Sequence, residues 1–90
     1  MLIPTRPVIK FVLPSHDLSS KLNLIRGNAY FDLKQYDKAI QDYNKAIELD
    51  PNYALAYYNR AVAYYQIGEY DKAIQDYNKA VELDPSLGSD

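Results

Sequence analysis

Apolar residues recur along residues 36–50 at the three- and four-residue steps of an amphipathic helix. They are Tyr36, Ala39, Ile40, Tyr43, Ala46, Ile47 and Leu49. Because an α-helix turns once every 3.6 residues, this spacing predicts one apolar stripe that faces other helices. Charged residues fill the other side, where Asp42 stands within one helical turn of Lys38 and Lys45. We therefore expect Asp42 to lie on the solvent-exposed face, paired with these lysines.

The same pattern returns 34 residues further along the chain. Residues 35–52 and residues 69–86 differ at only three positions, and a weaker likeness extends upstream of both segments. Self-similarity at a fixed period of this length is typical of stacked helical repeats. Two copies fit the sequence, at residues 20–53 and residues 54–87.

Each copy is predicted to form two helices joined by a tight turn. The first helices are expected over residues 17–33 and residues 52–67, and each second helix ends before a proline, which disfavours helical geometry in the residue before it. Gly68 follows the first helix of the second copy, where a left-handed backbone suits glycine. Lys34 holds this position in the first copy, and it should cost about 1 kcal/mol if the backbone is the same.

This 34-residue unit resembles the tetratricopeptide repeat, a helix–turn–helix module. The pattern is kept best in the second copy, at Tyr57, Ala61, Tyr64, Gly68, Tyr70, Ala73, Tyr77, Ala80 and Pro85. In the first copy the matching positions are Gly27, Tyr30, Tyr36, Ala39, Tyr43, Ala46 and Pro51. The first copy departs from the pattern at Asn23, where an aromatic residue is usual, and at Lys34, where glycine is usual. The resemblance implies an all-α fold, a fragment of an α-solenoid with four antiparallel helices.

The resemblance also divides the chain into segments. Residues 20–53 and 54–87 are the two repeats, residues 1–19 are an extended N-terminal arm that leads into the first helix, and residues 88–90 are a tail. Residues 8–13 are rich in β-branched and aromatic side chains and stand between two prolines, so an extended path is expected there. Two interpretations stay open: a disordered leader, or an arm that packs on apolar repeat surface of its own or a partner chain.

Composition argues against several classes of function. The 90 residues carry a formal net charge of -2 and no cysteine, and His16 is the one histidine. A nucleic-acid surface needs a basic excess, and thiolate metal sites need cysteine. Ser15, His16 and Asp17 are the residue types of a hydrolase triad, but three consecutive residues cannot normally converge around a substrate, so they predict a helix start. We expect no enzyme activity, metal, cofactor, nucleic-acid or membrane partner, and a cytoplasmic location.

Proteins that resemble this family hold extended peptides on the concave face lined by the first helix of each repeat. The resemblance therefore implies a protein-interaction module. The expected binding residues are Leu24, Asn28, Phe31, Leu55, Tyr58, Asn59, Val62, Tyr65 and Gln66, with Lys21 and Asp32 on the same face. They combine an apolar and aromatic floor with amides that can bond to a peptide backbone.

Two of these asparagines resemble the clamp with which co-chaperone repeats bind the C-terminal carboxylate of heat-shock chaperones. Asn28 and Asn59 are 31 residues apart, as in such a clamp. However, Leu24 stands where the first clamp lysine is expected, and the third repeat that carries a further lysine and an arginine is absent. Each charge-assisted bond lost in this way removes about 1.5–3 kcal/mol. We therefore expect no useful affinity for an acidic Glu-Glu-Val-Asp tail.

Self-assembly through the repeat surface is the alternative function. Residues 71–83 match residues 37–49 apart from one position, so a helix inside the stack and one at its end present nearly the same faces. The face around Tyr77, Ala80 and Val81, which a further repeat would cover, is expected to be partly exposed. A symmetric homodimer, stacked or helix-swapped, is the expected way to cover it.

Overall fold

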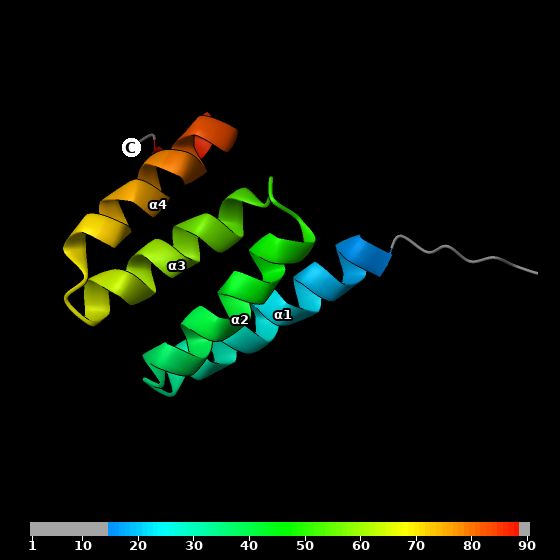
Figure 1. Cartoon of the computed structure of the whole chain (residues 1–90), viewed down its shortest axis with the longest axis horizontal. Helices are drawn as coiled ribbons and strands as arrows, with labels where there is room; N and C mark the ends of the chain where they lie inside the picture. Colours follow the sequence, from blue (N-terminus) through cyan, green and yellow to red (C-terminus); the bar gives the residue numbers. More distant parts are fainter. Residues whose placement is uncertain (1–14, 89–90) are drawn as a thin grey trace, which may run out of the picture.

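Four α-helices and one short 3-10 helix make up the computed structural model, which describes residues 15–88 (Figure 1). They are α1 (Ser15–Asp32), α2 (Tyr36–Leu49), α3 (Ala54–Gln66), α4 (Tyr70–Leu83) and the 3-10 helix η1 (Pro85–Gly88). No strand occurs in this part of the chain, so the predicted all-α class is confirmed. The two interpretations of residues 8–13 concern a segment outside the described residues.

The helices stack as two antiparallel hairpins. α1 packs against α2, α3 packs against α4, and α3 also lies against α2. Figure 1 shows α3 between α2 and α4. α3 begins two residues later than expected because Asp50 accepts a hydrogen bond from the Asn52 amide at 3.1 Å, which holds the chain in a turn before the helix starts. The arrangement is that of two stacked helix–turn–helix repeats.

Small residues allow the helices to approach one another closely. Ala39, Ala46, Ala56 and Ala63 have no exposed surface and belong to one buried cluster with Tyr43. Alanine at helix contacts is compatible with axes about 8–10 Å apart. The large ring of Tyr43 fills the space that remains, and close packing of this kind makes the core sensitive to changes in volume.

An arginine in each first helix pairs with a carboxylate buried in the second helix of the same hairpin. Arg26 donates hydrogen bonds from Nε and Nη2 to Asp42, both at 2.8 Å. Arg60 makes the same contact with Asp76, at 2.6 and 2.7 Å. The prediction that Asp42 lies on the solvent-exposed face is therefore wrong. Its partner comes from a different helix, which spacing within one helix cannot reveal.

The turns after α1 and α3 share one backbone shape. Lys34 and Gly68 both have a left-handed backbone, with φ of 63° and 84°. The amide of the next residue in each turn donates back into the helix, to the carbonyl oxygens of Tyr30 and Tyr64 at 2.9 Å. This hydrogen bond is typical of the Schellman motif that glycine usually closes. The condition under which Lys34 should carry a cost, the same left-handed backbone as at Gly68, is therefore met.

Replacing Lys34 with glycine should stabilise the protein by about 1 kcal/mol, because the left-handed backbone then costs nothing. For a domain of this size the melting temperature should rise by about 4–8 °C. Gly68→Ala is the matched control: a Cβ at Gly68 has no atom within 4 Å, so its expected loss of about 1 kcal/mol reflects backbone strain alone. Thermal denaturation measures both variants, and an unchanged midpoint for Lys34→Gly would contradict the argument.

Candidate functional site

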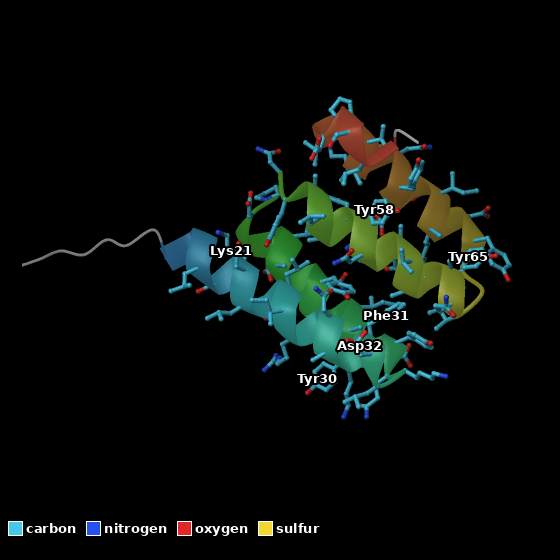
Figure 2. The ribbon with its side chains drawn as sticks, turned by 180° about the vertical axis from the view of Figure 1, so that it is seen from behind. Lys21, Tyr30, Phe31, Asp32, Tyr58 and Tyr65 are labelled. Carbon is cyan, nitrogen blue, oxygen red and sulfur yellow. The ribbon has the colours of Figure 1, made fainter. Side chains whose placement is uncertain are left out.

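A hollow lies between α1 and α3, the first helices of the two hairpins. Its volume is about 350 Å³, and its lining residues are Asn28, Phe31, Asp32, Tyr43, Asn59 and Val62. Figure 2 shows Phe31 and Asp32 on the side of α1 that faces α3, whereas Tyr30 points away from it. We call this hollow the α1–α3 pocket.

Amide side chains form the polar centre of the α1–α3 pocket. Oδ1 of Asn28 accepts hydrogen bonds from the Tyr43 hydroxyl at 2.6 Å and from Nδ2 of Asn59 at 3.0 Å. Among the atoms that the structure describes, the side-chain N–H groups of Asn28 and Oδ1 of Asn59 have no hydrogen-bond partner. Donors and an acceptor that are held close together match the N–H and C=O groups of an extended peptide backbone.

Burial is the main reason why the pKa of Tyr43 is raised, to about 12. The negative charges of Asp32 and Asp42 raise this pKa further, because they oppose formation of a phenolate. The folded protein therefore keeps Tyr43 neutral, as a donor to Asn28.

The raised pKa predicts a loss of stability in alkaline solution. An unfolded tyrosine ionises near pH 10, so the contribution of the neutral hydroxyl is complete below about pH 10 and is lost as the pH rises through about 12. The expected loss is about 2–3 kcal/mol. Urea unfolding between about pH 9 and about pH 12 should show a shallower decline for Tyr43→Phe than for the parent. Parallel curves would indicate that Tyr43 plays no part, since the other titrating groups are common to both proteins.

The residues predicted for the binding face do not gather in one place. Those that line the α1–α3 pocket are Asn28, Phe31, Asn59 and Val62. Leu24 is only 7% exposed and lies in the buried cluster that joins α1 and α2 to α3, so its place on the binding face is a wrong prediction. Leu55 and Gln66 are exposed on α3 but do not line this pocket.

A second, apolar groove runs between α3 and α4. Its volume is about 460 Å³, and its lining residues are Tyr58, Ala61, Val62, Tyr65, Tyr70, Ala73, Ile74 and Tyr77. Tyr58 and Tyr65, both labelled in Figure 2, were predicted for the peptide face. Their rings lie beside rings of α4: the Tyr58 centre is 6.1 Å from that of Tyr77, and the Tyr65 centre is 5.2 Å from that of Tyr70. We call this surface the α3–α4 groove.

The exposed face of α4 differs from the one expected from the sequence. Tyr77 is exposed as predicted, but Ala80 has no exposed surface. Val81 lies beside Gly88 of η1: a Cβ added to Gly88 would lie 2.9 Å from Cγ2 of Val81. Ile74, which was not among the residues expected on this face, is exposed in the groove. The exposure of Ile74 could have been expected from the sequence, because Ile74 stands three residues before Tyr77 in the apolar stripe that both copies share.

The residue types considered for catalysis stand together at the start of α1. α1 begins at Ser15, so the candidate triad of Ser15, His16 and Asp17 lies within its first turn. Among residues 18–88, whose side chains the structure describes, no group of three His, Cys, Asp or Glu residues is placed to hold a metal ion. Within the same residues, none of the helices has the length and hydrophobicity needed to cross a membrane.

The sequence matches models of one repeat family over most of its length. Residues 27–68 match a model described as TPR repeat, and residues 54–87 match a model described as tetratricopeptide repeat. The solved structure of the second TPR of Spaghetti (RPAP3), bound to HSP90 peptide SRMEEVD, is 33% identical with a TM-score of 0.76. That match covers 82% of this chain and 70% of the Spaghetti chain.

Two longer proteins are similar over a smaller share of their length. The crystal structure of MamA is 37% identical with a TM-score of 0.73, over 74% of this chain and 39% of the MamA chain. The Hsp70-Hsp90 organising protein of Plasmodium falciparum (isolate 3D7) is 43% identical over 37 residues, which are 41% of this chain and 7% of that protein. The chain thus spans well under half of either relative.

Proposed function

Because the chain belongs to the tetratricopeptide repeat family, we propose that it is a non-catalytic protein-interaction module that binds an extended peptide in the α1–α3 pocket. The observation that carries this proposal is the hydrogen bond between Asn59 and Asn28. It links the first helices of the two repeats and leaves N–H and C=O groups available at the pocket. Phe31 and Val62 supply apolar sides, which strengthen hydrogen bonds by excluding water.

The charge at the α1–α3 pocket indicates which peptides it accepts. Asp32 is the one charged residue in its lining, and its carboxylate is near enough to raise the pKa of Tyr43. A peptide that carries several carboxylates would meet a like charge there, whereas a neutral or basic peptide would not. We therefore infer that the preferred ligand is a neutral or basic extended segment.

An acidic tail that ends in Glu-Glu-Val-Asp should bind at least about tenfold more weakly than a peptide of the same length in which amides replace the carboxylates. The HSP90 peptide SRMEEVD bound to Spaghetti is of this acidic kind. Here Leu24 is buried at the position where the resemblance places a carboxylate-binding lysine, and Asp32 adds repulsion. A tenfold difference is about 1.4 kcal/mol, no more than the loss of one charge-assisted hydrogen bond.

Isothermal titration calorimetry with two synthetic peptides tests both proposals. The probes are SRMEEVD and an amidated SRMQQVN, in which amides replace the carboxylates. SRMQQVN should bind, and Asn59→Ala should weaken its binding by about three- to tenfold through the loss of one or two hydrogen bonds. Gln41→Ala, on the exposed side of α2, is the control and should bind like the parent.

Two outcomes of this titration would count against the proposals. If SRMQQVN fails to bind, or binds equally well to Asn59→Ala, then the α1–α3 pocket is not the peptide site. If SRMEEVD binds less than about tenfold more weakly than SRMQQVN, the argument from charge is contradicted.

The alternative, self-assembly, is favoured by a separate observation, the apolar α3–α4 groove with exposed Ile74 and Tyr77. Asn28 and Asn59 do not line that groove. Val62 lines both surfaces, so the two functions are separated by substitutions away from it: Asn59→Ala tests peptide binding and Ile74→Asp tests self-assembly.

A further inference from the structure

The two ends of the helical stack carry complementary apolar surfaces, a ridge on α1 and the α3–α4 groove. The ridge, which we call the α1 stripe, consists of Leu18, Leu22, Ile25, Ala29 and Leu33, all of them exposed. Contiguous apolar surface of this kind usually marks an interaction site. Burying it would be favourable by about 25 cal/mol for each Å² removed from water.

The α3–α4 groove repeats a surface that is already covered elsewhere in the molecule. Thirty-four residues earlier, the equivalents of its lining residues are Leu24, Gly27, Asn28, Phe31, Tyr36, Ala39, Ile40 and Tyr43. On that earlier surface Ile40 and Tyr43 are buried in a cluster that includes Ala56 and Ala63 of α3. The α3–α4 groove should therefore accept a helix whose surface resembles the side of α3 that packs against the first hairpin.

The α1 stripe occupies the same repeat positions as that face of α3. Leu22 is equivalent to Ala56, and Ala29 is equivalent to Ala63. The two α3 alanines have no exposed surface, whereas Leu22 and Ala29 are exposed. Within residues 15–88, α1 therefore carries at these positions a surface like that of α3, but no other helix covers it.

The polar contact at the internal junction is replaced by an apolar pair at the two ends. Inside the molecule, Asn59 of α3 donates a hydrogen bond to Asn28 of α1. The equivalent of Asn59 on the α1 stripe is Ile25, and the equivalent of Asn28 in the groove is Val62. Because both partners change from amide to aliphatic, a junction of the two ends buries no unpaired amide at this point.

A second polar contact of the internal junction, between Arg60 and Asn44, has equivalent residues at the two ends of the stack. Nη1 of Arg60 donates to Asn44 on the neighbouring hairpin at 2.8 Å. The equivalent arginine, Arg26, is 65% exposed and uses Nε and Nη2 for Asp42. The equivalent of Asn44 is Asn78, which is exposed on α4. At a junction between copies, Nη1 of Arg26 can donate to Asn78 as Arg60 does to Asn44.

We propose that the α1 stripe of one copy docks in the α3–α4 groove of a second copy, in the register that α3 has on the first hairpin. The contact is head-to-tail because it joins two different surfaces, so every open assembly keeps a free stripe and a free groove. The assembly grows with concentration instead of stopping at a dimer. This arrangement goes beyond peptide binding, and it differs from the symmetric homodimer expected from the sequence.

Sedimentation of the full chain over a concentration series tests the proposal. The average mass should rise above twice the 10.4 kDa of one chain. Ile25→Asp disables the α1 stripe and Ile74→Asp disables the groove, and both side chains are 59% exposed, so the hairpins should still fold. Each variant alone should associate at least about tenfold more weakly, because docking would bury a carboxylate without a partner.

A mixture of the two variants distinguishes head-to-tail from symmetric docking. Ile25→Asp keeps an intact groove, and Ile74→Asp keeps an intact stripe. Equal amounts should therefore form a one-to-one heterodimer that grows no further. Gln41→Asp, on the exposed side of α2, is the control and should associate like the parent.

Three outcomes would overturn the proposal: a parent that stays monomeric at high micromolar concentration, Ile25→Asp that associates as strongly as the parent, or a mixture that forms no heterodimer. The first outcome includes the case in which residues 1–14 cover the groove, and the second indicates groove-to-groove docking. Circular dichroism checks folding, and Leu22→Asp or Tyr70→Asp replaces a variant that fails to fold. Binding of SRMQQVN should persist in Ile74→Asp, so the failure of one proposal is distinguishable from that of the other.

Discussion

Replacing Arg60 with methionine should lower the free energy of unfolding by about 3–5 kcal/mol, because it leaves a buried carboxylate unpaired. The side chain of Arg60 is 19% exposed and that of Asp76 is 9% exposed, and two short hydrogen bonds join them. The hydrogen bond to Asp76 is the main reason that the pKa of Arg60 is raised, which keeps the guanidinium charged. Since small domains are stable by only about 5–15 kcal/mol, this loss should unfold much of the population on mild heating.

Urea unfolding followed by circular dichroism measures the effect of Arg60→Met. Lys79→Met removes an exposed ion pair with Glu82 at 3.8 Å and should change the free energy by less than about 1 kcal/mol. Combining Arg60→Met with Asp76→Leu should recover much of the loss, because no charge then remains buried. If Arg60→Met alone is as stable as the parent, the ion pair between Arg60 and Asp76 does not hold the second hairpin together.

Tyr43→Ala should destabilise the protein by about 3–5 kcal/mol, the range for removing a buried aromatic side chain. Tyr43 is 1% exposed, and its ring is in such close contact with Gly27 that a Cβ there would lie 2.6 Å from Cε1. Tyr77 occupies the equivalent position in a helix of nearly the same sequence, but it is 41% exposed. Tyr77→Ala should therefore cost only about 1 kcal/mol.

Thermal denaturation at low protein concentration compares the two tyrosine variants. A low concentration is needed because Tyr77 lines the groove proposed to bind a second copy. Equal losses in the two variants would contradict the view that the position in the stack, and not the local sequence, decides how much each ring contributes.

Much of the fold was predictable because its signals are local. The apolar stripe identified α2 and α4, and the turn position of Lys34 was recognised because Gly68 stands 34 residues later in the same motif. A helix and its turn are determined largely by residues within four or five positions of one another. Such elements can therefore be found without knowledge of the neighbours they contact.

The candidate site was only partly predictable, because its members depend on contacts between helices. Asn28 and Asn59 were expected on one face, and they meet in the α1–α3 pocket. Leu24 was expected beside them but is buried. Asp42 was assigned to solvent, yet it pairs with Arg26 from another helix. Spacing along one helix shows which residues share a face and does not show what covers that face.

The amino-acid sequence by itself determined the repeat, its helices and its turns, since these follow from local backbone preferences and from a 34-residue period. Only the tertiary structure decided which of two nearly identical faces is buried. Tyr43 and Tyr77 have the same sequence neighbours, but α3 lies against α2, whereas α4 has no further helical hairpin against it within residues 15–88. The physical reason is that burial depends on neighbouring surfaces, and these are brought together by packing between elements far apart in the sequence.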